Sequence, residues 1–256
     1  MLPRSGLMEE MTWPEVAAAA TANVPVVLSI GSTEQHGPHL PLGTDCYLPQ
    51  GVALELAKRM DLVVAPPIRF GAYSRALSGG GETFPGTLSL RANTLITTIA
   101  EVVCGLARTG FRRICVYNWH YENAGFLWEA CDLAVERYPA IRIVLLENPM
   151  PNFTPDELAA LYPNGFPGWD VEHAAIMETA MMLALRPDLV HSDRIVDDEA
   201  DRHPSWDVIP APAAFIPKSG VLWHPSEATL EIGQRFLTAV VARLEAAIRT
   251  EFELGG

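Results

Sequence analysis

The chain has 256 residues, of which 49% are hydrophobic and 19% are charged, so it can bury the core of one large domain or two small ones. These proportions exclude a disordered chain and a fibrous repeat. Lysine and arginine together number 18 against 31 aspartates and glutamates, which gives a net charge of −13. A surface of this sign repels a phosphate backbone, so we expect no nucleic acid partner.

Cysteine usage and the hydrophobic runs predict a cytoplasmic protein. The four cysteines form no C-x-x-C pair, which indicates buried thiols in a reducing compartment. Residues 1–16 contain acidic side chains where a signal peptide has an apolar run. No segment approaches the roughly 20 uninterrupted apolar residues of a membrane span, so we expect no membrane partner either.

Short β-branched runs alternate with longer segments of helical periodicity. In chain order, the sequence predicts strand 25–30, helix 48–60, strand 62–65, helix 93–109, strand 113–117, helix 123–138, strand 141–146, and helices over about 171–185 and 229–252. Strands this apolar suit a sheet that is covered on both faces, and their alternation with helices implies crossover connections. We therefore predict an α/β fold with a mostly parallel central sheet, built as a single domain over residues 1–256.

The proline-rich segment 190–225 has little periodicity. A linker between domains is not favoured there, because the chain beyond it forms only one predicted helix. We expect the segment to be an arm over the site or a subunit contact.

Polar residues concentrate directly after two predicted strands, where open parallel sheets bind ligands. Glu34 and His36 follow the first strand, and His120 and Glu122 follow the third. Alternate side chains of extended backbone point the same way, so each pair can converge on one point. Asp45 ends a Pro/Gly-rich excursion that can fold back between the pairs. Five nitrogen and oxygen ligands without a thiolate predict two divalent metal ions, Zn²⁺ and/or Mn²⁺, with Asp45 as the bridge.

A glycine-rich loop offers candidate substrate contacts. Ser78, Gly79 and Gly80 lie where the backbone can approach a small ligand, because glycine has no Cβ. The loop matches neither a P-loop nor G-x-G-x-x-G, so nucleotide binding and NAD-dependent oxidation have little support. His39 is consistent both with a hydrogen bond that supports a metal ligand and with a purely structural one.

Four segments resemble the creatininase (creatinine amidohydrolase) family. GSTEQHGPHLPLGTD (31–45) and NWHYEN (118–123) are similar to its two metal-binding motifs. SGGGETFPGTLSL (78–90) and GFPGWDVEHAAIMETAMMLALRPDLV (165–190) are similar to its creatininase branch. The resemblance extends over nearly the whole chain. It implies a three-layer α/β/α fold, a homo-oligomer that is a hexamer built of dimers, and hydrolysis of a C–N bond in a small cyclic amide.

The resemblance also implies how the metal ligands divide. Glu34, Asp45 and His120 would hold one ion, and His36, Asp45 and Glu122 would hold the other, with water or hydroxide between the two ions. These are the same five residues that the spacing singles out.

Four further residues match positions that approach the substrate in the creatininase branch: Tyr121, Trp169, Glu172 and His173. His173 is the candidate for proton transfer to the leaving nitrogen, with Asp170 as the expected helix N-cap before it. The division of roles between Glu172 and His173 stays open. A favourable interaction with the helix N-terminus explains Glu172 equally well, and Trp169 either stacks on a flat ring or packs its loop.

Two positions depart from the family pattern. Trp119 stands where the family usually has glycine, and the segment around Pro149 lacks a tryptophan that creatininase has there. The leading hypothesis is a two-metal amidohydrolase for creatinine or a related cyclic ureide, lactam or imide. The alternatives are hydrolysis of a linear amide, formamide or short peptide, and a non-catalytic α/β metal-binding protein.

Overall fold

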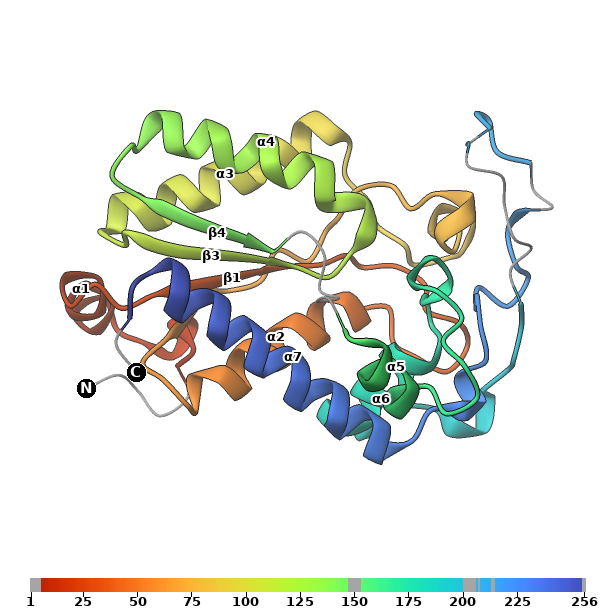
Figure 1. Ribbon diagram of the computed structural model, residues 1–256. Coiled ribbons are helices and arrows are strands. Elements are labelled where there is room, and N and C mark those ends of the chain that lie inside the picture. Colours follow the sequence, from red (N-terminus) through yellow and green to blue (C-terminus); the bar gives the residue numbers. More distant parts are fainter. Residues whose placement is uncertain (1–5, 147–152, 200–205, 207, 213–214, 255–256) are drawn as a thin grey trace.

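The computed structural model describes residues 6–146, 153–199, 206, 208–212 and 215–254. At its centre lies a sheet with the strand order β2-β1-β3-β4 (Figure 1). Its strands are β1 Val26–Ile30, β2 Val63–Val64, β3 Arg113–Asn118 and β4 Arg142–Leu146. All three strand pairings are parallel. The predicted strands are thus present with small shifts at their ends, and the parallel α/β fold class is confirmed.

Helices cover both faces of the sheet, with α3 and α4 on one side and α2 and α7 on the other (Figure 1). The helices of the first side are α1 Trp13–Thr21, α3 Ala92–Thr109 and α4 Ala124–Arg137. Those of the second side are α2 Thr44–Ala57, α5 Pro155–Leu161, α6 Ile176–Leu185 and α7 Leu230–Glu251. This arrangement confirms the three-layer α/β/α architecture.

The alternation of side chains along β1 divides the core between the two layers. Val26, Leu28 and Ile30 pack with α1, α3 and α4, whereas Val27 packs with α2, α6 and α7. All five β1 residues are buried, as expected for a strand covered on both faces. None of the helices in the described part of the chain is long and apolar enough to cross a bilayer.

Helix α2 begins at Thr44, before the expected residue 48, and places Asp45 in its first turn. This start lies against the end of β1: a Cβ on Gly31 would come within 2.2 Å of the Asp45 carbonyl oxygen. Only glycine allows so close an approach of two backbone segments. The Pro/Gly-rich excursion therefore does return to the strand that precedes it, and the first carboxylate of α2 lies beside the residues that follow β1.

Helix α6 begins at Ile176 with Ala175 as its N-cap, later than the predicted residue 171. The expectation that Asp170 caps this helix is wrong, because Trp169–Val171 forms a separate 3-10 turn. Glu172 and His173 consequently lie in the irregular segment between the two. Helices α1 and α5 were not predicted. Each of the two follows a threonine whose partner glutamate completes a capping box.

Candidate active site

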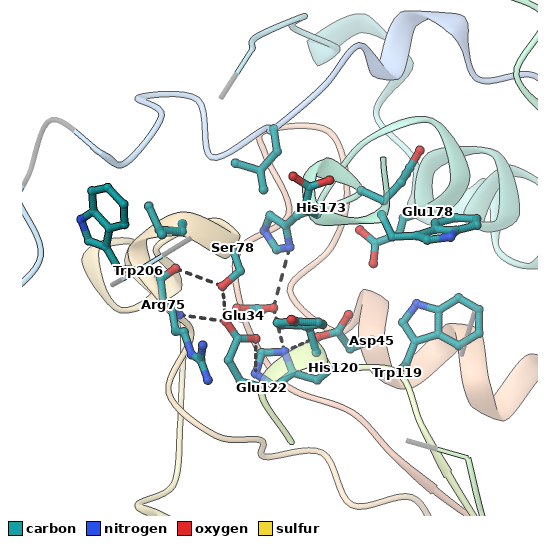
Figure 2. Close-up of a pocket in the computed structure, with 16 residues that line it drawn as sticks. Glu34, Asp45, Arg75, Ser78, Trp119, His120, Glu122, His173, Glu178 and Trp206 are labelled. Carbon is teal, nitrogen blue, oxygen red and sulfur yellow. Dashed lines mark hydrogen bonds and ion pairs between the residues drawn. The ribbon is translucent and has the colours of Figure 1, made fainter. Parts of the chain in front are cut away.

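A cavity of about 300 Å³ opens beyond the carboxyl ends of β1 and β3, where the sequence predicted a site (Figure 2). Nine of the twelve candidate residues line it: Glu34, Asp45, Ser78, His120, Tyr121, Glu122, Trp169, Glu172 and His173. His36 is fully buried behind the wall, and Gly79 and Gly80 are buried at its edge. The remaining lining residues are Arg75, Leu77, Trp119, Asp170, Glu178, Trp206 and Leu222.

Glu34, Asp45 and His120 meet at one point of the cavity wall. Nδ1 of His120 lies 3.0 Å from Oε1 of Glu34 and 3.2 Å from Oδ2 of Asp45. The other ring nitrogen, Nε2, lies 3.0 Å from the carbonyl oxygen of Ala72. A histidine that binds a metal usually donates its second N–H to such an acceptor, which fixes the ring and frees the opposite nitrogen. One potential ligand atom from each of the three side chains lies within 4.8 Å of the others.

A second group joins His36, Asp45 and Glu178. Nε2 of His36 lies 3.1 Å from Oδ1 of Asp45 and 3.6 Å from Oε2 of Glu178. Asp45 thus offers one carboxylate oxygen to each group. Glu178 comes from the first turn of α6 and was not assigned a role by the sequence. A third possible combination is Glu34 and His36 with His173, whose Nδ1 lies 3.9 Å from Oε1 of Glu34.

Glu122 lies on the far side of His120 from this second group. Its Oε1 accepts hydrogen bonds from the Arg75 backbone N–H, at 2.9 Å, and from the Ser78 hydroxyl. Its Oε2 lies 3.5 Å from Nε2 of His120. In the structure Glu178, rather than Glu122, accompanies His36 and Asp45. The role of Glu122 as a metal ligand stays a prediction.

The electrostatics of the cluster favour a positive charge at its centre. Burial alone would lower the pKa of His36, but Asp45 and Glu178 raise it well above its usual value. Burial is likewise outweighed at His120, whose pKa is raised mainly by Glu34 and Asp45. Opposite charges next to a titratable group stabilise its charged form. The buried carboxylates therefore create a negative potential that attracts cations.

Oε2 of Glu34 and Oδ2 of Asp45 are buried and accept no well-directed hydrogen bond from the described residues, although Nδ1 of His120 lies 3.2 Å from Oδ2 of Asp45. A buried carboxylate oxygen without a partner is costly, and metal coordination is one of the few ways to stabilise it. Nitrogen and oxygen donors suit Zn²⁺ and Mn²⁺. The neighbouring thiol of Cys46 donates to the carbonyl oxygen of Ser32 at 3.2 Å and belongs to none of the three groups of potential ligands. The residues present therefore fit a pair of divalent ions.

Gln35 is a site residue that the sequence analysis missed. Its Nε2 donates to the carbonyl oxygens of Gly79 and Gly220, both at 3.0 Å, and lies 2.9 Å from Nε2 of His173. Its Oε1 accepts the N–H of Gly37. Gln35 thus ties the glycine-rich loop and the end of segment 190–225 to His173. Its position between Glu34 and His36 in extended backbone indicates that its side chain points away from theirs, which gives no sign of the contact with His173.

Glu172 and Glu178 bind backbone N–H groups next to the start of α6. Oε2 of Glu172 accepts the Met177 N–H at 3.1 Å, and Oε2 of Glu178 accepts the Ala174 N–H at 2.7 Å. These contacts match the helix N-terminus interaction that the sequence suggested for Glu172. Burial raises the pKa of Glu172 to about 8. Glu172 thus has both a structural contact and a place on the cavity wall.

Aromatic side chains form much of the remaining wall. Trp169 packs against Phe166 and Phe153, with ring centroids 4.6 and 5.8 Å apart, which supports its ring from behind. Tyr121 is 68% exposed and Trp206 is 67% exposed, so both stand at the mouth. His39 takes no part in the cavity. Its Nε2 lies 2.9 Å from the Thr179 hydroxyl, a structural hydrogen bond.

Comparisons with known proteins agree with the motifs. The model of the creatininase family, described as creatinine amidohydrolase, matches residues 9–248. A creatinine amidohydrolase of Pseudomonas putida is 39% identical over 98% of this chain and 99% of its own length. A mycofactocin precursor peptide peptidase of Mycolicibacterium smegmatis is 32% identical over 85% of this chain and 82% of its own.

Solved creatininase structures have the same fold. A substituted creatininase of Zn-Zn type, 39% identical, superposes with a TM-score of 0.92 over 97% of this chain and 98% of its own. A manganese form, also 39% identical, superposes with a TM-score of 0.91 over 97% of this chain and 99% of its own. The chain therefore belongs to the creatininase family of hydrolases.

Proposed function

We propose that the protein is a two-metal amidohydrolase that cleaves a C–N bond of a small cyclic amide, creatinine or a related cyclic ureide, lactam or imide. The observation that carries this proposal is the position of Asp45, whose two carboxylate oxygens face two different imidazoles at 3.1 and 3.2 Å. A shared carboxylate is typical of hydrolytic sites with two metals about 3.5–4 Å apart. The similarity to creatinine amidohydrolase supports the amide substrate.

Glu34, Asp45 and His120 would hold one ion. His36 and Asp45 would hold the other, together with Glu178 or Glu122. Zn²⁺ and Mn²⁺ are the metals named for the solved creatininases, and both accept nitrogen and oxygen ligands. When bound, the ions polarise the amide carbonyl and lower the pKa of a nearby water.

The protein groups around the cluster would bind the substrate and move a proton. Nδ1 of His173 is the ring nitrogen closer to the ligand carboxylates, so it is placed to deliver a proton to the leaving nitrogen. Gln35 holds the opposite edge of that imidazole. The Trp169 ring, supported by its aromatic neighbours, offers a flat wall for a planar substrate. Ser78 holds the carboxylate of Glu122 in place.

Hydrolysis of a linear amide or short peptide is the second candidate, and the similarity to a peptide peptidase is what favours it. Four residues that line the cavity argue against it, because they match the creatininase branch: Tyr121, Trp169, Glu172 and His173. We further propose that the enzyme is cytoplasmic and forms a homo-oligomer, by resemblance a hexamer. Light scattering measures the oligomeric state directly.

The proposal is tested by metal analysis and a hydrolysis assay on one preparation, purified without chelator. We expect about two divalent ions per chain and turnover of at least one cyclic amide from a panel of creatinine, cyclic ureides, lactams, imides and linear amides. Chelation should abolish turnover, and Zn²⁺ or Mn²⁺ should restore it. The exposed Asp61 offers a matched control, since Asp61→Asn should change neither readout. Absence of bound metal, or turnover that survives chelation, would contradict the proposal.

A further inference from the structure

Trp119 is part of the cavity wall beside the proposed metal ligands. It directly follows β3, and only 4% of its surface is exposed. The ring packs edge-on against Tyr117, with centroids 6.0 Å apart. Figure 2 shows the indole next to Asp45, with its nitrogen on the side that faces Asp45 and Glu178. Trp119 and both of these carboxylates line the cavity.

The indole nitrogen of Trp119 is a buried donor that no described residue accepts. An indole N–H can only donate, and a buried tryptophan usually has an acceptor for it. Three oxygens of the nearby carboxylates have other contacts: Oδ1 of Asp45 lies 3.1 Å from Nε2 of His36, Oδ2 of Asp45 lies 3.2 Å from Nδ1 of His120, and Oε2 of Glu178 accepts the Ala174 N–H. Leaving such a donor unpaired costs more free energy than the hydrogen bond itself contributes. The geometry therefore calls for an acceptor on a molecule inside the cavity.

We infer that Trp119 is a specificity-determining residue whose indole N–H donates a hydrogen bond to an oxygen of the substrate. This inference rests on the proposed function. In the proposed function the carbonyl of the amide bond that breaks lies at the metal cluster. The oxygen that accepts the Trp119 N–H must therefore belong to a second carbonyl group of the substrate. The preferred substrate class is then a cyclic amide with two carbonyl groups, such as a cyclic ureide or imide. In a ring that carries an amino group in place of the second carbonyl, an N–H of the substrate would face the N–H of Trp119. A site that is built to bind an acceptor disfavours such a substrate.

Hydantoin and creatinine form a suitable pair of probes. Both are five-membered rings with an amide carbonyl, and hydantoin has a second carbonyl where creatinine has an amino group. The reaction is the same for both: water adds across the C–N bond, its hydroxyl goes to the carbonyl carbon, and its proton goes to the ring nitrogen. Creatinine also carries a methyl group on one ring nitrogen, so the effect of the variant is measured on each compound separately and the two effects are then compared.

The experiment compares the wild type with Trp119→Phe, which keeps an aromatic ring and removes the N–H. Trp128→Phe is the matched control, because Trp128 lies on α4 and is 66% exposed. In the zinc-loaded enzyme, W119F should lower kcat/KM for hydantoin about tenfold, in line with the loss of one hydrogen bond, and should leave kcat/KM for creatinine unchanged or raised, because the opposing donor is gone. W128F should change neither. An equal effect of W119F on both substrates, or no effect on hydantoin, would overturn the inference.

Calorimetric binding separates this inference from the proposed function. If no cyclic amide is hydrolysed, the proposed function fails, but hydantoin binding to the zinc-loaded protein still tests Trp119. A Kd that rises about tenfold in W119F and not in W128F supports the hydrogen bond. No binding, or equal binding to wild type and W119F, overturns it. Unchanged thermal unfolding of W119F confirms that the variant is folded.

Discussion

Asp45 and His120 meet with Oδ2 of the carboxylate 3.2 Å from Nδ1 of the imidazole, although one lies at the start of α2 and the other follows β3. The same carboxylate reaches His36 through its other oxygen. Asp45→Asn keeps the size of the side chain but removes the charge and one acceptor oxygen. Because both ligand groups share Asp45, we expect the variant to lose both ions and to lower kcat at least about 10³-fold.

Metal analysis and steady-state kinetics check this prediction together. The same analysis on Asp61→Asn controls for the loss of one negative charge at an exposed position. A D45N protein that retains two ions per chain would show that Asp45 is not the shared ligand.

Either Glu178 or Glu122 completes the proposed second metal site, together with His36 and Asp45. Glu178 contacts His36, whereas Glu122 is held by Ser78. We expect Glu178→Gln to weaken binding of one of the two ions about 10- to 100-fold while the glutamine oxygen still accepts the Ala174 N–H. Titration of the metal-free variants with Zn²⁺ measures both affinities. A loss in E122Q with none in E178Q would instead assign the position to Glu122.

Gln35 should matter for both stability and turnover. Gln35→Leu keeps the side chain volume but removes the donor to two buried carbonyl oxygens and the acceptor for the Gly37 N–H. Each buried group that loses its partner costs about 1–3 kcal/mol, so the thermal midpoint should fall by several degrees. Because His173 also loses its neighbour, kcat should fall with little change in KM. Calorimetry and kinetics test the two effects, and a parallel loss of kcat and gain in KM would point to general loosening of the loop.

The pKa of Glu172 predicts a pH-dependent contribution to stability. Burial raises it from an ordinary 4.5 to about 8. The folded protein therefore binds this proton more tightly than the unfolded chain, and stability from this group is complete below about pH 4.5 and is lost as the pH rises through about 8. Glu172→Gln cannot ionise and should lose less stability than the wild type between pH 6 and pH 9. Denaturant unfolding at the two pH values, with the same metal load in both proteins, makes the comparison; an identical loss in both would show that Glu172 ionises freely.

Much of the fold followed from hydrophobic periodicity. The strands and the long helices α3, α4 and α7 were predicted to within a few residues, because each has a continuous apolar stripe or run. The start of α6 was predicted too early. Its first turn is set by local side-chain contacts, in which Glu172 and Glu178 bind N–H groups near the helix start, and Ala174 has a φ of 52°, which a right-handed helix does not contain. Periodicity does not report such contacts.

The same distinction separates the site residues that were predicted from those that were missed. Glu34 and His120 were expected in one site because each follows a strand of a parallel sheet, and the family resemblance placed them on the same ion; the structure brings them within 3.0 Å. Glu178 and Gln35 were missed because their positions depend on how α6 and the glycine-rich loop pack against the sheet. Spacing along the chain predicts neighbours on one strand or helix, but it does not predict which distant segment covers them.

The contact of Gly31 with the backbone of Asp45 limits which parts of such an enzyme can change during evolution. The main chain at the end of β1 packs directly against the main chain at the start of α2. Asp45 therefore has little freedom to move relative to the ligands that follow β1. The walls of the cavity have a different origin: Ser78, Tyr121 and Trp169 lie in three short 3-10 turns. Substitutions in these walls can alter which molecule enters while the hydrolytic centre keeps its geometry. Trp169 lies far along the chain from the proposed ligands and can change independently of them, whereas Tyr121 lies between His120 and Glu122 and is tied to the hydrolytic centre.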